Sequence, residues 1–394
     1  MQGNFVCLCS VSAKIQRKKT CQNESENMTV LTFFIVFIGF AYFVLISAFL
    51  VGFLRTEQFS DTTDLQEETQ MPFLSVVIAF KDEEQNLPIL LESLKLQSLS
   101  KDSYEIIFVN DFSTEEVSVF LQNTIKKLTN VKLIQNTLQQ SKKYALKCGI
   151  IAAKGTHIVT TDADCRPSPA WLETIFNHYR NCDSKMLIAP VIFQSDTFFG
   201  QIQTLDFLSL TASGYGAAGL KKPILCNGAN FSYEKSLFFE FEDSFRYDIP
   251  SGDDVFLLHA AKKKYADKIR FLKSKNAVVF SSPVSNMTEL IRQRKRWASK
   301  SKKFSDKFTL LTAFIVLLMY LVLFLVPILS VFMTIKPLLW LPLIFKIAID
   351  FIFLAVVSAY FKQGKLMRLF LPVWILSGLF SLFIAVIAIF SNRK

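Results

Sequence analysis

Four long, uninterrupted apolar segments constrain this chain more than any other feature of its sequence. They cover residues 29–54, 308–335, 338–361 and 369–390. Each is close to or above the roughly 20 residues that an α-helix needs to cross the hydrocarbon core of a bilayer. Hydrophobic residues make up 51% of the chain and include 40 Phe, which is more than a soluble protein usually carries. The sequence therefore predicts four transmembrane helices, with the lipid bilayer as a partner.

The first apolar segment is predicted to be a membrane anchor rather than a cleaved signal peptide. It is longer than the roughly 7 to 15 apolar residues of a signal peptide, and no small-residue cleavage site precedes Arg55. The preceding residues 1–28 are polar and show no helical periodicity. We interpret them as an N-terminal tail to which the sequence assigns no function.

The net charge of +11 would suit a nucleic-acid partner, but the positions of the charges indicate a membrane instead. Basic residues gather beside the second, third and fourth apolar segments, as in cytoplasmic flanks. This pattern predicts a cytosolic domain over residues 72–306 of an integral protein, which we place in a bacterial inner membrane, and no nucleic-acid partner. The basic residues within 14–19 oppose this orientation. The flanking residues are Lys300, Lys302, Lys303, Lys307, Lys362, Lys365 and Arg368.

The cysteine and histidine residues indicate neither a disulfide framework nor a zinc site. The chain has 7 Cys and 3 His, without any Cys-x-x-Cys pair or a suitably spaced histidine partner. Reduced thiols are typical of a cytosolic domain.

Strands and helices alternate in the segment between the first and second spans. Short apolar runs predict the strands, and amphipathic runs between them predict the helices. This alternation is typical of an α/β fold with a doubly wound, mostly parallel sheet. No glycine-rich phosphate-binding motif occurs, so phosphate must be neutralised in another way. The predicted strands are 73–80, 105–109, 131–134 and 157–161, and the predicted helices begin at 84 or cover 117–128 and 144–153.

Acidic residues follow three of the predicted strands. Glu83, Asp111 and the pair Asp162 and Asp164 come directly after apolar runs, where parallel sheets bind their ligands. Two carboxylates in one short turn suit Mg²⁺ or Mn²⁺, with substrate phosphates completing the coordination. The alternative interpretations are a solvated turn for the Asp-x-Asp pair and an Asx turn that caps a helix at Asn110.

Two further segments carry side chains suited to chemistry. Asp253 and Asp254 precede an apolar helical segment, and adjacent carboxylates repel each other unless they are used or solvated. Either could deprotonate a hydroxyl, and we choose Asp254 first. Gln293, Arg296 and Trp297 lie just before the second span, where arginine suits a diphosphate and tryptophan a sugar face. Spacing alone equally fits a basic, aromatic helix at the membrane surface.

Two features of the apolar segments leave alternatives open. Residues 198–209 place apolar side chains at helical spacing, which indicates either a helix on the inner leaflet that presents a lipid acceptor or an ordinary core helix. Lys346 and Asp350 lie four residues apart inside the third span. Because charges are costly there, we expect them to pair on one face of the helix.

Seven motifs, taken together and in order, resemble the motif series of the family-two inverting glycosyltransferases, which have a GT-A fold. The resemblance covers nearly all of residues 72–300 and is strongest to membrane synthases of the cellulose, hyaluronan and poly-N-acetylglucosamine type. Its specificity comes from the ordered co-occurrence of the motifs. They occupy residues 81–84, 110–113, 142–146, 162–165, 227–230, 252–254 and 293–297.

The resemblance implies a role for each matching residue on the donor side. Glu83 and Asp111 would hold the nucleoside, and Asp162 and Asp164 would hold the diphosphate and a divalent cation. Lys143 is a further phosphate contact or, equally well, a surface lysine.

On the acceptor side, the resemblance makes Asp254 the catalytic base, with Asp253 beside it. Gln293, Arg296 and Trp297 match a motif that caps the diphosphate and borders the acceptor. Residues 252–254 read Gly-Asp-Asp where processive synthases usually have Thr-Glu-Asp. That departure bears on processivity more than on catalysis.

These observations lead to one functional hypothesis and two competitors. The hypothesis is a membrane-bound transferase that moves a sugar from a nucleotide-sugar donor, such as a UDP-sugar, to a glycan or lipid-linked acceptor for cell-surface polysaccharide or glycolipid synthesis. The competitors are a membrane scaffold or transporter with a nucleotide-binding domain and a metal-dependent phosphohydrolase.

Overall fold

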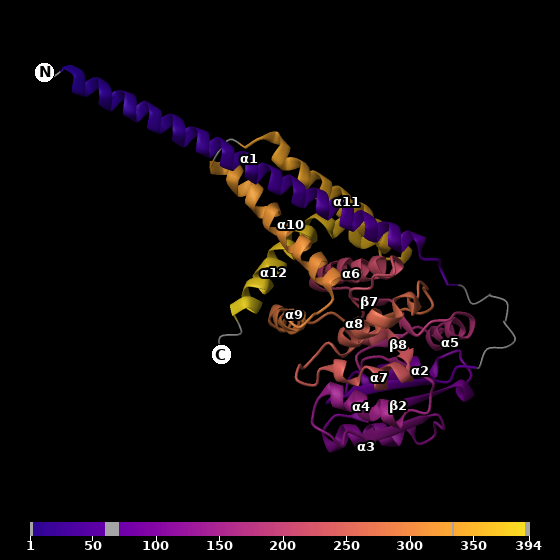
Figure 1. The fold of residues 1–394 in the computed structure, drawn as a ribbon. Coiled ribbons are helices and arrows are strands. Elements are labelled where there is room, and N and C mark those ends of the chain that lie inside the picture. Colours follow the sequence, from indigo (N-terminus) through magenta and orange to yellow (C-terminus); the bar gives the residue numbers. More distant parts are fainter. Residues whose placement is uncertain (1–2, 60–70, 333–334, 391–394) are drawn as a thin grey trace.

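The computed structural model describes residues 3–59, 71–332 and 335–390. Within these residues, an α/β domain lies at one end of a group of long helices (Figure 1). Residues 1–2 of the predicted tail and residues 333–334 of the predicted second span lie outside the described residues.

A seven-stranded sheet forms the centre of the α/β domain, in the order β3-β2-β1-β4-β8-β6-β9. Its neighbouring strands pair in parallel except at β8, which runs antiparallel to β4 and β6. The predicted α/β fold with a mostly parallel sheet is confirmed. The strands are β1 (Leu74–Phe80), β2 (Tyr104–Asn110), β3 (Val131–Gln135), β4 (His157–Thr160), β6 (Met186–Ile188), β8 (Phe231–Glu234) and β9 (Ile269–Phe271).

Both faces of the sheet are buried, which explains why its strands read as continuous apolar runs. Successive side chains of a strand point to opposite faces. Val77 therefore packs into one core with α4, α6 and α8, while Val76 and Ile78 pack into a second core with α2, α3 and α5. The helices of the domain are α2 (Leu87–Lys95), α3 (Glu115–Ile125), α4 (Lys142–Ala152), α5 (Trp171–Asn181), α6 (Phe198–Gly219), α7 (Lys235–Glu240), α8 (Asp253–Tyr265) and α9 (Met287–Ser301).

A second, three-stranded sheet lies in the order β5-β10-β7. Its strands are short: β5 (Arg166–Pro167), β7 (Val191–Phe193) and β10 (Val279–Ser281). β7 pairs in parallel with β10, and β5 pairs antiparallel with it. This sheet carries residues 191, 193 and 281 to the edge of the cleft described below.

Four helices within the described residues are long and apolar enough to cross a membrane, as the sequence predicted. Their apolar parts cover Met28–Arg55, Lys307–Phe332, Pro337–Tyr360 and Gly364–Ile387. The helices themselves are α1 (Gly3–Arg55), α10 (Lys307–Phe332), α11 (Leu341–Tyr360) and α12 (Phe370–Phe390).

One of these helices, α1, differs from the sequence-based expectation. α1 begins at Gly3, so the helix extends into the polar segment that showed no helical periodicity. Extending an existing helix costs far less than nucleating a new one. Figure 1 shows α1, α10 and α11 running together away from the α/β domain, whereas α12 takes another direction and lies beside α9.

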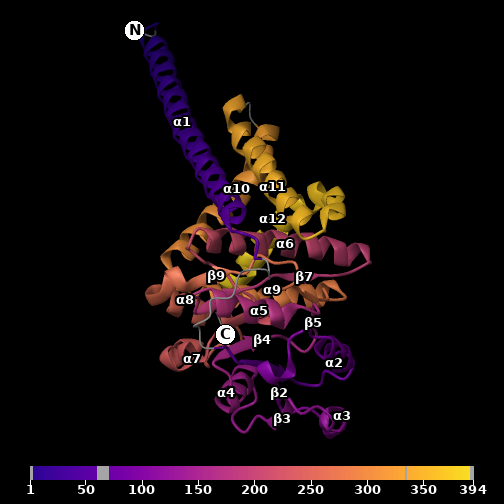
Figure 2. The ribbon, with the colours of Figure 1, turned by 90° about the vertical axis from the view of Figure 1, so that its right-hand side faces the viewer.

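The helix α6 joins the two parts of the molecule. It lies between the long helices and the sheet (Figure 2). Its backbone touches that of α1, because a Cβ atom on Gly52 would come 2.1 Å from the carbonyl oxygen of Gly216. Leu205 and Leu208 of α6 are buried in the core, whereas Phe198 at its start is exposed. These two leucines fit the core-helix alternative, whereas the start of the stripe is not buried.

The predicted pairing of Lys346 and Asp350 is confirmed. The two side chains form an ion pair of 2.5 Å within α11. Tyr42 of α1 donates a hydrogen bond to Asp350 at 2.7 Å, and Trp374 of α12 donates another at 2.8 Å. This buried group therefore links three of the four long helices.

Candidate functional site

A cleft of about 520 Å³ opens at the carboxyl ends of the central parallel strands. It brings together nine of the ten site residues that the sequence predicted, although they are up to about 200 residues apart in the chain. The tenth, Lys143, does not line it. The nine are Glu83, Asp111, Asp162, Asp164, Asp253, Asp254, Gln293, Arg296 and Trp297.

Tight turns after β1 and β2 hold the acids at these strand ends in place. Asp82 and Phe112 adopt left-handed backbone conformations, with φ of 52° and 61°. The backbone N–H of Ser113, three residues further on, donates to the Asn110 side chain at 2.8 Å. Asn110 does not cap the following helix as the alternative interpretation expected, because Thr114 is the N-cap residue of α3. Asp111 is buried and its Oδ1 accepts from the Asn136 side chain at 2.7 Å and from a backbone N–H at 3.0 Å. Both of these hydrogen bonds use the same carboxylate oxygen.

Asp162 and Asp164 follow β4 and share the cleft with Glu83. Burial raises the pKa of Asp164, and the charges of Asp162 and Glu83 raise it further. Ser281 donates a hydrogen bond to Asp164 at 3.4 Å. The charge of Lys142 lowers the pKa of Asp164, so a cation within the cleft partly neutralises these carboxylates.

Lys142 supplies positive charge that the sequence analysis had assigned to its neighbour. Its Nζ lies 2.5 Å from Oδ1 of Asp162. Burial alone would lower the pKa of Lys142, but the charges of Asp162 and Asp253 outweigh it and raise that pKa above its ordinary value. Lys142 is therefore a positively charged side chain that lines the cleft.

Lys143 points away from the cleft and supports the fold instead. Its ammonium donates to the carbonyl oxygens of Phe245 and Arg246 at 2.7 and 2.8 Å, and its side chain is buried. Burial lowers the pKa of Lys143 to about 8. Adjacent residues on a helix point about 100° apart, which lets Lys142 face the cleft while Lys143 points into the protein.

Asp253 and Asp254 begin α8, where the helix N-terminus favours negative charge. The preceding Gly252 has φ of 90°, and a Cβ atom there would also come 2.9 Å from the Phe256 ring. Burial raises the pKa of Asp253, and the charges of Asp254 and Asp162 raise it while that of Lys142 lowers it.

The α9 helix presents one face to the cleft. Gln293, Arg296, Trp297 and Lys300 line it, and their spacing of three, four and seven residues places them on one side of a helix. Gln293 Oε1 is buried and has no hydrogen-bond partner within the described residues. Lys300, which the sequence placed only among the residues that flank the membrane, lies 3.8 Å from the Asp254 carboxylate. Its position seven residues after Gln293 was the available signal.

The donor set fits a divalent cation that also binds substrate oxygens. Within the described residues, no three Asp, Glu, His or Cys side chains lie close enough to hold a metal ion by themselves. Mg²⁺ and similar ions usually bind through one or two carboxylates and complete their shell with phosphate and water. Asp162 and Asp164 supply such a pair at the edge of the cleft.

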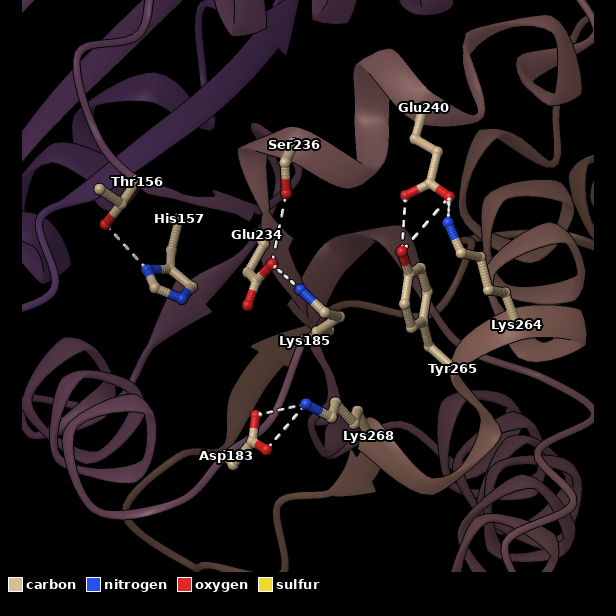
Figure 3. Close-up of polar contacts among 10 residues, drawn as sticks. All are labelled: Thr156, His157, Asp183, Lys185, Glu234, Ser236, Glu240, Lys264, Tyr265 and Lys268. Carbon is tan, nitrogen blue, oxygen red and sulfur yellow. Dashed lines mark hydrogen bonds and ion pairs between the residues drawn. The ribbon is translucent and has the colours of Figure 1, made fainter. Parts of the chain in front are cut away.

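A second polar cluster lies at the opposite ends of the strands, beside a cavity of about 470 Å³ lined by His157 and Glu234. Figure 3 shows that its acidic side chains are all paired: Glu234 with Lys185, Glu240 with Lys264 and Tyr265, and Asp183 with Lys268. Burial lowers the pKa of His157 to about 4, so the ring is neutral at physiological pH. Because these charges satisfy one another, the strand-end cleft is the better functional candidate.

Comparisons with known proteins point in the same direction. The family model described as Glycosyl transferase family 2 matches residues 75–245. Glycosyltransferase AglE of Haloferax volcanii is 27% identical over 103 residues, which are 26% of this chain and 34% of that protein. The uncharacterized glycosyltransferase sll0501 of Synechocystis is 32% identical over 109 residues, 27% of this chain and 34% of that protein. The chain thus matches about a third of the length of these curated relatives.

One solved structure resembles nearly the whole chain. The mannosyltransferase PcManGT of Pyrobaculum calidifontis, solved in complex with GDP-Man and Mn²⁺, matches with a TM-score of 0.50 and 15% identity. The match covers 91% of this chain and 100% of that one. At this identity the likeness supports the fold, including the arrangement of the α/β domain with helices that follow it.

Proposed function

Because residues 75–245 form a glycosyltransferase family 2 domain, we propose that this chain is a membrane-bound inverting glycosyltransferase. It moves a sugar from a nucleotide-sugar donor to a glycan or lipid-linked acceptor. Relatives that match part of the chain are named glycosyltransferases, and the chain has helices able to cross a membrane.

The observation that carries the proposal is that acidic and basic side chains from distant parts of the sequence lie together in one cleft. Strand ends contribute Glu83, Asp111 and the Asp162–Asp164 pair, while Asp254 begins a helix on another side. Lys142, Arg296 and Lys300 face them. A nucleoside diphosphate needs hydrogen-bond acceptors for its nucleoside and cations for its phosphates, and both are present here.

The donor half of the cleft would hold the nucleotide sugar as follows. The other carboxylate oxygen of Asp111 and the carboxylate of Glu83 accept hydrogen bonds from the nucleoside, for which we propose uridine. Arg296 and Lys142 approach the diphosphate. When bound between Asp162 and Asp164, Mg²⁺ or Mn²⁺ would supply further positive charge against the departing diphosphate.

The acceptor half would carry the chemical step. Asp254 removes the proton from an acceptor hydroxyl, the oxygen attacks the anomeric carbon from the face opposite the diphosphate, and configuration is inverted. Trp297, Phe193 and Phe207 form an apolar wall beside this position, suited to the flat face of a sugar ring. Positive charge from Arg296 stabilises the leaving group as its bond breaks.

The proposal includes a location and an orientation. The basic residues beside the spans favour a catalytic domain on the cytosolic side of a bacterial inner membrane. Nucleotide sugars are made in the cytosol, so this orientation gives the cleft direct access to its donor. The product would serve cell-surface polysaccharide or glycolipid synthesis.

A donor screen tests the proposal. Detergent-solubilised protein is incubated with UDP- and GDP-sugars, Mn²⁺ and a native lipid extract, and the release of nucleoside diphosphate is measured together with transfer to the lipid fraction. The proposal expects diphosphate release that depends on both metal and acceptor. Release of free sugar phosphate would favour a phosphohydrolase instead, and nucleotide binding without turnover would favour a scaffold or transporter.

A further inference from the structure

Asp206 joins three helices at the border between the α/β domain and the long apolar helices. It lies in the middle of α6, and its side chain is 23% exposed. Arg294 of α9 donates to Oδ2 of Asp206 at 2.5 Å, and Ser377 of α12 donates to Oδ1 at 2.5 Å. Each carboxylate oxygen therefore holds a different helix.

Arg294 connects this junction to the cleft. Its guanidinium carbon lies 4.7 Å from the ring centroid of Trp297, three residues further along α9, where a cation over an aromatic face is stabilising. The Arg294 side chain is 13% exposed, and its Nε has no hydrogen-bond partner within the described residues. Among the residues that the structure describes, Asp206 is the one carboxylate that forms an ion pair with Arg294.

Phe207, the residue after Asp206, reaches the same place from α6. Its ring centroid lies 6.0 Å from that of Trp297 and 4.0 Å from that of Phe193, with which it stacks. All three rings line the cleft. Trp297 is therefore held from α6 in two ways: by direct ring contact and by the Asp206–Arg294 pair.

The α12 side of the junction reaches the buried group in the long helices. Trp374 lies one turn before Ser377 in α12 and donates to Asp350 of α11 at 2.8 Å. Residues three apart share one face of a helix. The same face of α12 is thus fixed to α11 at Trp374 and to α6 at Ser377.

We propose that Asp206 is a positioning residue for the acceptor half of the cleft, which it sets by fixing Arg294 beneath Trp297 and by tying α9 to α12. The inference rests on the proposed transferase function, because it takes the Trp297 wall as the place where the acceptor lies. It assigns to the apolar helices a part in setting the geometry of the active site, beyond anchoring the domain.

The Asp206–Arg294 ion pair is largely shielded from water. Neutralising Asp206 leaves the Arg294 cation half-enclosed without its counter-ion, and such unpaired charges reorganise toward water. Arg294 would then leave the Trp297 ring, and the indole would lose one of its two supports. On the donor side, Asp111, Asp162 and Lys142 are held by elements other than α9. The change reaches the donor side only through Arg296 of α9, so we expect the donor to be affected less than the acceptor.

A double-mutant cycle in the full-length protein tests this inference. The variants are Asp206→Asn, Arg294→Gln and their combination, and the measured quantities are the apparent KM for the donor and the amount of native lipid extract that gives half-maximal transfer. We expect each single variant to raise the acceptor requirement by about tenfold with little change in donor KM. We also expect the double variant to be no worse than either single one, because the two residues act as one unit.

Matched controls separate positioning from general damage. Asp206→Glu keeps the charge and should recover most of the acceptor affinity. Asp306→Asn breaks another partly buried ion pair at the membrane border, with Lys262 at 2.9 Å. It should lower thermal stability without changing the acceptor requirement. The inference would be overturned if the fold-changes of Asp206→Asn and Arg294→Gln multiplied in the double variant. It would also be overturned if donor KM rose as much as the acceptor requirement.

A spectroscopic readout keeps the inference testable even if no transfer is found. Fluorotryptophan labelling gives one ¹⁹F resonance for each of the 4 Trp residues, and Trp297→Phe identifies the Trp297 signal. We expect Asp206→Asn and Arg294→Gln to shift that resonance alike, whereas Asp306→Asn leaves it in place. An unchanged Trp297 resonance would overturn the positioning role, and a wild-type protein without transfer activity would contradict only the proposed function.

Discussion

The backbone N–H of Gly228 donates a hydrogen bond of 2.9 Å to Oδ2 of Asp254. The other oxygen of Asp254 accepts from the N–H of Val255 at 2.7 Å. Gly228 follows Asn227 in the turn before β8, the antiparallel strand whose first residue pairs with the end of β4. The reversed strand therefore brings a backbone donor to the cleft and fixes the orientation of the proposed base.

Replacing Asp254 with Asn should abolish transfer while leaving nucleotide binding intact. The amide is nearly the same size and its oxygen still accepts one backbone hydrogen bond, but it cannot take up a proton at neutral pH. We expect kcat to fall by about 10²- to 10⁴-fold, the usual contribution of a general base. Nucleoside diphosphate binding measured by calorimetry checks that the donor site is unchanged. If Asp253→Asn caused the larger loss, Asp253 would be the base.

Lys142 and Lys143 should give opposite results when each is replaced by Met. Lys142→Met removes a cation from the cleft, so we expect donor affinity to fall roughly 10- to 100-fold, typical of a lost charged hydrogen bond, with stability little changed. Lys143→Met takes the Lys143 donor away from the buried Phe245 carbonyl oxygen and leaves that of Arg246 with the N–H of Ile249, so it should lower the free energy of unfolding by about 1–3 kcal/mol. Donor titration and thermal unfolding of both variants decide between these roles. The reverse pattern would restore the assignment made from sequence.

The different roles of these two lysines could not be predicted from the sequence alone. Apolar periodicity predicted β1 to β4, their alternation with helices, and the acids at the ends of β1, β2 and β4, because these depend on local patterns. It did not predict the shorter strands β5 to β10. It did not predict which of two adjacent lysines faces the cleft. That choice depends on where α4 begins, and Ser141 sets this by accepting a hydrogen bond from the N–H of Lys143 at its N-terminus.

Asp206 shows a second limit, since nothing in its local sequence distinguishes it. Its partners Arg294 and Ser377 are 88 and 171 residues away, and they meet only because α12 lies beside α9. Spacing within a single helix carries no information about such packing. Lys346 and Asp350 were predictable by contrast, because four residues separate them on one helix and their charges are costly in an apolar segment.

The ionised Asp253 carboxylate should lower the stability of the folded protein at neutral pH. Its pKa is raised in the folded protein, chiefly by burial, so the folded state binds this proton more tightly than the unfolded state does. The associated stability is present below the unfolded pKa and is lost as pH rises through the folded pKa. We therefore expect Asp253→Asn to melt roughly 2–4 °C above wild type at pH 7, equivalent to about 1 kcal/mol.

The difference in stability between wild type and Asp253→Asn should shrink as pH falls through the raised pKa of Asp253, because wild type then gains the proton. Thermal unfolding of both from pH 4 to pH 8, in EDTA and without nucleotide, provides the comparison. A variant that is less stable than wild type at pH 7 would show that Asp253 is stabilised as an anion, contrary to this account.

Removing one partner of the buried Lys346–Asp350 pair should destabilise the protein more than removing the charges of both partners. Lys346→Met leaves the Asp350 carboxylate with Tyr42 and Trp374 as its remaining donors, and breaking a buried pair typically costs about 3–5 kcal/mol. Adding Asp350→Asn removes the stranded charge and should recover most of this loss. Thermal unfolding in lipid nanodiscs measures both variants. A double variant as unstable as Lys346→Met would show that the pair contributes through packing and not through charge.

The central claim is that the strand-end cleft transfers a sugar from a nucleotide donor. It is tested most directly by measuring nucleoside diphosphate release from a panel of UDP- and GDP-sugars by wild type and by a variant carrying Asp162→Asn and Asp164→Asn. The assay contains Mn²⁺ and native lipid extract. We predict release by wild type with at least one donor, dependence on both metal and extract, and loss of release in the variant. Equal release by the variant, or none from any donor by wild type, would contradict the account.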